Sequence, residues 1–181
     1  SFVVVLNALI KPLWIFGVDR VFQNRVGEEL YGQYFTLFSL SVILSVFLDI
    51  GITGYNTRNI ARYPKLFGKY LSKTLSLKTS LFLLYFLILL ICFISIGYDT
   101  HLGVLLFVLG LNQGLNSFIL YLRSNLVALH YFTLDSVVSV LDKGMLVLFF
   151  GIAFIKSEAF VPSLLYFALA QTIVYVLVTM V

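Results

Sequence analysis

The 181-residue sequence contains little that would support catalysis or bind a metal. Its single cysteine, Cys92, lies within an apolar run, cannot form a disulfide inside the chain, and is not part of a metal-ligand pattern. Neither a nucleophile–base pair nor a glycine-rich phosphate loop is recognisable. Charged residues make up only 11% of the chain, whereas about a quarter is usual for a soluble globular domain. These absences argue against an enzyme, a metal centre, a cofactor and a water-soluble fold.

Apolar residues take the place of the missing charges, and they occur in long runs. Hydrophobic residues make up 61% of the chain, and the mean hydropathy is +1.04. The runs approach the roughly 20 residues that a membrane-spanning helix needs. We therefore expect an all-α, polytopic membrane protein with six transmembrane helices. The expected spans are approximately residues 2–23, 33–53, 79–98, 102–122, 134–155 and 161–181. Because the sequence starts and stops within apolar runs, we expect it to be part of a longer membrane protein.

A basic stretch at residues 54–78 predicts the orientation of these spans. No acidic residue lies between Asp49 and Asp99. Lys and Arg in short loops are retained on the cytoplasmic side, so this stretch and the N-terminus are expected there. Most of the net charge of +4 lies in this stretch, which indicates contact with anionic membrane lipids rather than with nucleic acid. An amphipathic helix here would carry one cationic stripe on the inner membrane surface. The stripe residues are Arg58, Arg62, Lys65, Lys69 and Lys73. Asp49 is expected to pair with Arg58 or Arg62.

Several charged and polar residues lie within the expected spans. A central Lys, Arg or Asp costs about 2.5–3.5 kcal/mol on insertion scales, so such groups usually face protein or a wet cavity. The candidates for substrate contact are Lys11, Arg20, Asn112, Asn116 and Lys143. Asp49 and Asp142 are candidates for cation coupling or for structural ion pairs. Other interpretations stay open: Arg20 can reach the interface, and the two asparagines can join helices.

Two further features concern the helices themselves. Pro12 is expected to kink the first span, because proline removes a backbone donor. Gly110 and Gly114 form a Gly-x-x-x-Gly pair, with Gly103 on a similar face. Small residues at this spacing let a second helix approach closely.

Several short segments occur in an order that is typical of one family. They are residues 26–34 (VGEELYGQY), 48–52 (LDIGI) and 58–62 (RNIAR), with weaker similarity at 123–125 and 139–143. In these segments, over most of its length, the chain resembles the polysaccharide-biosynthesis membrane proteins. These are the lipid-linked oligosaccharide flippases of the multidrug/oligosaccharidyl-lipid/polysaccharide exporter superfamily. The resemblance implies two six-helix lobes around a cavity that opens to one side at a time, with this chain as the N-terminal lobe and a second lobe as its partner.

The resemblance and the buried charges together predict a flippase of the bacterial inner membrane. Its substrate would be a polyprenyl diphosphate glycan, such as an O-antigen precursor of lipopolysaccharide, and glycan polymerases or glycosyltransferases are expected partners. A wet, cationic cavity would replace the hydration that the diphosphate loses, with Lys11 and Lys143 as the main contacts. Asn112 and Asn116 would bond sugar hydroxyls. Two alternatives remain: a cation-coupled drug antiporter using Asp135 and Asp142, and a non-transport membrane scaffold that binds a partner through the basic helix.

Overall fold

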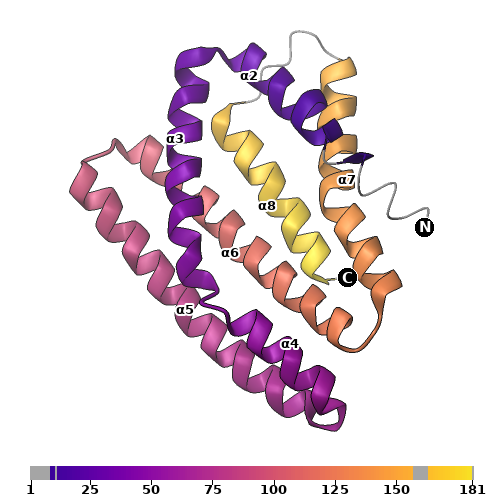
Figure 1. Ribbon diagram of the computed structural model, residues 1–181. Coiled ribbons are helices and arrows are strands. Elements are labelled where there is room, and N and C mark those ends of the chain that lie inside the picture. The colour runs from indigo at the N-terminus through magenta and orange to yellow at the C-terminus, as the bar shows by residue number, and fades with distance from the viewer. Residues whose placement is uncertain (1–8, 11, 157–162, 181) are drawn as a thin grey trace.

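The computed structural model describes residues 9–10, 12–156 and 163–180 (Figure 1). Every regular element in this part of the chain is helical. The α-helices are α2 (Arg20–Val26), α3 (Glu28–Leu44), α4 (Ile52–Arg62), α5 (Phe67–Ile96), α6 (Thr100–Ala128), α7 (Phe132–Lys156) and α8 (Leu164–Met180). The π-helix η1 (Leu13–Asp19) precedes α2, and the 3-10 helices η2 (Ser45–Leu48) and η3 (Pro64–Leu66) follow α3 and α4.

Three stretches among the described residues are long and apolar enough to cross a membrane: Glu28–Leu48, Pro64–Ile96 and Thr100–Ala128. Helix α8 is apolar but shorter. The all-α membrane class predicted from the sequence is therefore confirmed. The count of six spans stays a prediction, as does the side of the membrane on which each end lies.

Helix α6 is the central element of the bundle. It packs against α3, α4, α5, α7 and α8, and it runs between α5 and α8 in Figure 1. Its buried side chains include Leu105, Leu106 and Leu109. Helix α5 lies at the outside, and the apolar side chains of Leu83 and Ile94 on it are more than half exposed. An exposed apolar surface of this kind is what lipid would cover.

The predicted glycine face of α6 is confirmed as a helix contact. A Cβ atom on Gly114 would meet the ring of Phe82 on α5, and a Cβ atom on Gly110 would meet the side chain of Leu89. Gly103 lies equally close to Phe93. The absent side chains therefore allow α5 and α6 to approach each other closely along several turns.

The expected single cationic stripe is wrong, because the chain breaks within the basic stretch. Residues preceding proline avoid the helical region, and Tyr63, before Pro64, has φ −132° and ψ 70°. Pro64 begins η3 as its first residue, as proline often does in a helix. The five cations are thereby divided: Arg58 and Arg62 lie on α4, Lys65 on η3, and Lys69 and Lys73 on α5. Helices α4 and α5 pack side by side at this end of the molecule (Figure 1).

The opposite end of the bundle contains an aromatic core. The rings of Phe22 on α2 and Phe167 on α8 stack with their centroids 3.9 Å apart. Trp14 on η1 lies against Phe167 and against Phe150 on α7. The π-helix η1 begins directly after Pro12, and the kink expected at this proline stays a prediction. This core holds η1, α2, α7 and α8 together around the cavity described next.

Candidate functional site

Two adjoining cavities lie among the helices, with volumes of about 210 and 150 Å³. Both are lined by Phe38, Lys143, Gln171 and Tyr175, and we call them together the central polar cavity. The other residues lining the larger part are Trp14, Asp19, Tyr31, Tyr34 and Phe35. The other residues lining the smaller part are Val42, Leu109, Asn112, Gln113 and Asn116. Each part is large enough for water, and polar side chains from η1, α3, α6, α7 and α8 converge on it.

Lys143 of α7 lies where the two parts of the cavity meet. Its Nζ donates a hydrogen bond to Tyr175 Oη at 3.0 Å. The same Nζ is 5.3 Å from the ring centroid of Tyr175 and 6.0 Å from that of Trp14, which is within cation–π range. The sequence-based placement of Lys143 in a polar interior agrees with this geometry.

The cavity also contains a carboxylate that sequence reasoning did not select. Asp19, the last residue of η1, accepts a hydrogen bond from Tyr31 Oη at 3.1 Å. Among the described lining residues, Asp19 and Lys143 are the charged ones, so this part of the lining has balanced charges rather than a cationic excess. The signal in the sequence was a carboxylate inside an expected span.

The two asparagines of α6 differ in their surroundings. Asn112 is buried, and its Nδ2 donates to the Ala168 carbonyl oxygen of α8 at 2.9 Å. Its Oδ1 accepts from Thr172 Oγ1 at 2.7 Å. The helix-joining interpretation therefore describes Asn112 better than sugar binding does. Asn116 is only partly buried and lines the cavity together with Gln113, which the sequence analysis had not selected.

The remaining intramembrane candidates do not join this site in the described structure. Arg20 begins α2 and is exposed, outside the cavity lining. Lys11 and the side chain of Asp142 lie outside the described part of the chain. Asp135 instead accepts a hydrogen bond from Arg123 Nε at 2.7 Å, forming an ion pair between α7 and α6. No metal-binding group of His, Cys, Asp or Glu is found among the described residues.

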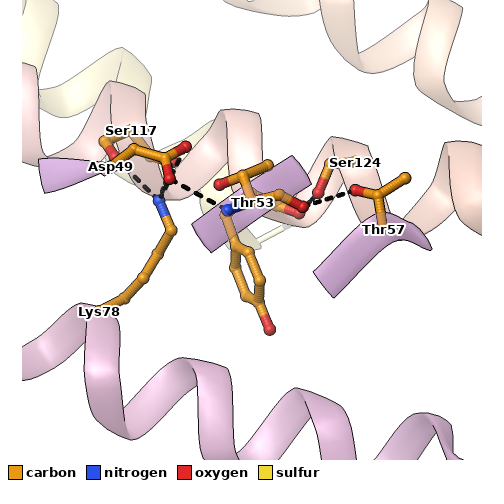
Figure 2. Close-up of polar contacts among 7 residues, drawn as sticks. Asp49, Thr53, Thr57, Lys78, Ser117 and Ser124 are labelled. Atoms are coloured by element: carbon orange, nitrogen blue, oxygen red, sulfur yellow. Dashed lines mark hydrogen bonds and ion pairs between the residues drawn. The ribbon is translucent and has the colours of Figure 1, made fainter. Parts of the chain in front are cut away.

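A second polar site lies where η2, α5 and α6 meet, and Figure 2 shows its contacts. Lys78 of α5 is 5% exposed. Its Nζ lies 3.8 Å from Asp49 Oδ2 and donates to Ser117 Oγ at 3.1 Å. Asp49 Oδ1 accepts a hydrogen bond from the backbone N–H of Thr53 at 3.0 Å, in the first turn of α4. The predicted pairing of Asp49 with Arg58 or Arg62 is thus wrong: the carboxylate pairs with Lys78 of α5, and both arginines are exposed further along α4.

A buried polar cluster fixes α4 to its neighbours. Asn56 Nδ2 donates to Asn125 Oδ1 at 2.7 Å, and Thr74 Oγ1 donates to Asn56 Oδ1 at 2.9 Å. One contact reaches α6 and the other reaches α5. Buried polar groups of this kind specify one packing arrangement, because displaced partners would be left unsatisfied. Helix α4 is therefore an integral part of the bundle.

The comparisons with known proteins agree with the membrane fold. No curated protein and no solved structure matches the chain. The family described as "Polysaccharide biosynthesis protein" matches residues 1–181, the full length of the sequence. The chain therefore belongs to the family of polysaccharide biosynthesis proteins, as its sequence segments predicted.

Proposed function

We propose that this chain forms one lobe of a flippase that moves a lipid-linked oligosaccharide across a bacterial inner membrane. The observation that carries the proposal is the central polar cavity, in which Lys143 lies among hydroxyl and amide side chains between apolar helices. Membership of the polysaccharide biosynthesis family supports the class of substrate. The N-terminus is assigned to the cytoplasm, the protein is assigned no catalytic activity, and a second transmembrane lobe would complete the cavity.

The chemistry of the cavity suits a diphosphate attached to a glycan. A diphosphate cannot enter hydrocarbon unless protein groups replace its hydration. The Lys143 ammonium supplies positive charge and N–H donors suited to phosphate oxygens, and the amides of Gln113, Asn116 and Gln171 can donate to or accept from sugar hydroxyls. Alternating exposure of the cavity to the two sides would then carry the polar head across, while the lipid chain stays in the bilayer. Glycan polymerases or glycosyltransferases are the partners that would use the product.

One observation favours a second candidate. Asp19 adds a carboxylate to the same cavity, and a carboxylate among apolar helices suits a cation-coupled drug antiporter. A non-transport scaffold has weaker support, since the cations expected to form its docking helix are divided by the break at Tyr63. The two transport candidates predict different phenotypes for a deletion strain: loss of surface glycan for the flippase and drug sensitivity for the antiporter.

The test compares charge-neutralised variants in a strain lacking the gene and complemented with the full-length protein. The double variant Lys11→Gln/Lys143→Gln removes the two lysines expected to contact substrate, and Lys65→Gln/Lys69→Gln removes two exposed lysines as the matched control. A hydrogen bond to a charged group contributes about 1.5–3 kcal/mol, so export should fall roughly 10- to 100-fold in the first variant only. Surface glycan is measured by gel and lectin staining, and membrane abundance by immunoblot.

The outcomes separate the candidates. Normal surface glycan in a well-inserted Lys11/Lys143 double variant contradicts the flippase assignment. A deletion strain that keeps its surface glycan but becomes drug-sensitive supports the antiporter instead. Recovery of export by Lys143→Arg, relative to Lys143→Gln, supports a requirement for positive charge at this position.

A further inference from the structure

A further cavity of the described structure lies apart from the central polar cavity, on the α5 side of the bundle. It has a volume of about 390 Å³, and we call it the lateral groove. Its lining comes from η2, α5, α6 and α8. The lining residues are Leu48, Lys78, Thr79, Phe82, Gly114, Leu115, Ser117, Phe118 and Thr179. The groove thus combines an apolar wall with one ammonium and three hydroxyl groups.

The depth of the groove follows from the length of α5. Lys78 precedes the end of this helix at Ile96 by eighteen residues, which at 1.5 Å per residue is about 27 Å. The hydrocarbon layer of a bilayer is about 30 Å thick, so Lys78 lies near one of its boundaries when Ile96 lies near the other. Phe82, one turn deeper, packs on Gly114. The polar end of the groove therefore lies at headgroup depth, and its apolar wall extends toward the bilayer centre.

The charge around the polar end favours an anion. Between residues 49 and 78 the sequence contains six lysines and arginines and one acidic residue, Asp49. Such a local excess of cations attracts anionic headgroups at the membrane surface. The N-terminal amides of α4 add positive potential beside Asp49, since they begin at Ile52. The carboxylate of Asp49 pairs with Lys78, and the other five cations leave this stretch of the chain with a net positive charge.

The size of the groove argues against a protein occupant. A helix about 10 Å across fills roughly 400 Å³ per turn, so the lateral groove accommodates about one turn. A stable helix–helix contact extends over several turns, as the α5–α6 contact does here from Gly103 to Gly114. A flexible hydrocarbon chain with a polar head fits the volume, the lining and the orientation together.

We propose that the lateral groove binds an anionic glycerophospholipid, with its phosphate at the Lys78 end and one acyl chain along Phe82 and Leu115. This site is distinct from the central polar cavity and does not depend on the proposed transport function. The phospholipid would fill the groove in the membrane and hold η2, α5, α6 and α8 at their observed separation.

The test uses the purified full-length protein in detergent, with phosphatidylglycerol and phosphatidylcholine as probes. Native mass spectrometry counts bound lipid, and thermal unfolding measures stabilisation. Thr79→Phe fills the groove from α5. Ser80→Phe is the matched control, because both hydroxyls are exposed and both donate to the carbonyl four residues earlier, but only Thr79 lines the groove. Thr179→Phe fills the groove from α8 and provides a second, independent variant.

We expect one phosphatidylglycerol to bind, with phosphatidylcholine binding at least about tenfold more weakly. Thr79→Phe and Thr179→Phe should each weaken phosphatidylglycerol binding about tenfold or more, since each new ring occupies space in the groove that the methylene groups of the acyl chain would fill. Ser80→Phe should bind as the wild type does. Equal binding of both lipids, equal weakening by Ser80→Phe, or unchanged binding in both groove variants overturns the proposal. Displacement of phosphatidylglycerol by a polyprenyl phosphate at a lower concentration also overturns it, by assigning the groove to the transported lipid.

Discussion

The replacement Asn112→Leu tests whether the buried amide of α6 joins helices or contacts substrate. The substitution conserves shape and removes the bonds to Ala168 and Thr172 of α8. Side-chain hydrogen bonds between transmembrane helices contribute on average about 0.6 kcal/mol each and at most about 1.7 kcal/mol. Thr172 Oγ1 keeps its own contact with the Ala168 carbonyl oxygen at 3.1 Å, so neither partner is left wholly unsatisfied. We therefore expect a loss of about 1–3 kcal/mol from two bonds.

The assay is thermal unfolding of the purified protein in detergent. For a domain of about this length, 1 kcal/mol shifts Tm by about 2–4 °C, so Tm should fall by roughly 2–12 °C. Asn116→Leu is the matched comparison on the same helix: it should leave Tm nearly unchanged and lower glycan export, because Asn116 lines the cavity. A double-mutant cycle of Asn112→Leu with Thr172→Val should give a coupling energy of about 0.6 kcal/mol. An Asn112→Leu protein with unchanged Tm and abolished export would refute the reasoning and restore Asn112 as a substrate contact.

Two other substitutions test the packing of the bundle. Gly114→Ala should destabilise the protein by about 1–3 kcal/mol, because the new Cβ meets an aromatic ring on α5. Gly151→Ala has open space and should be neutral or stabilising by up to about 1 kcal/mol. Chemical unfolding of both variants measures the difference, and equal stability contradicts the close contact. Asp49→Asn should lower the stability of the protein by about 1–3 kcal/mol, since it removes the anionic partner of the buried Lys78. Arg58→Gln should leave the stability unchanged. The same unfolding assay compares them, and a larger loss of stability in Arg58→Gln would support the pairing expected from the sequence.

Features that depend on one helix were predictable from the sequence. The glycine face of α6 needed only the helical period, because residues four apart share a face wherever the helix packs. The membrane class needed only the apolar runs. The break at Tyr63 also had a local signal: Pro64 restricts its predecessor, and this restriction outweighs the regular spacing of the surrounding cations.

Features that depend on which helices meet were not predictable in this way. Asp49 pairs with Lys78, twenty-nine residues further along the chain, instead of with the nearer arginines. That choice is made by the packing of η2 on α5, which brings these two residues together. The central polar cavity likewise depends on which helices meet, since its residues Asp19, Lys143 and Gln171 come from η1, α7 and α8. A single sequence indicates which residues share a face of a helix, but not which other helix packs against that face.

Helix α6 supplies both sites from adjacent positions. Within two turns, Gln113 and Asn116 face the central polar cavity, whereas Leu115 and Ser117 face the lateral groove. A shift or rotation of this segment cannot alter one wall without altering the other. If occupancy of the groove changes affinity in the cavity, occupancy of the cavity must change affinity in the groove by the same factor. If both proposed sites bind as described, a few residues of one helix would link the lipid composition of the bilayer to substrate binding in the central polar cavity.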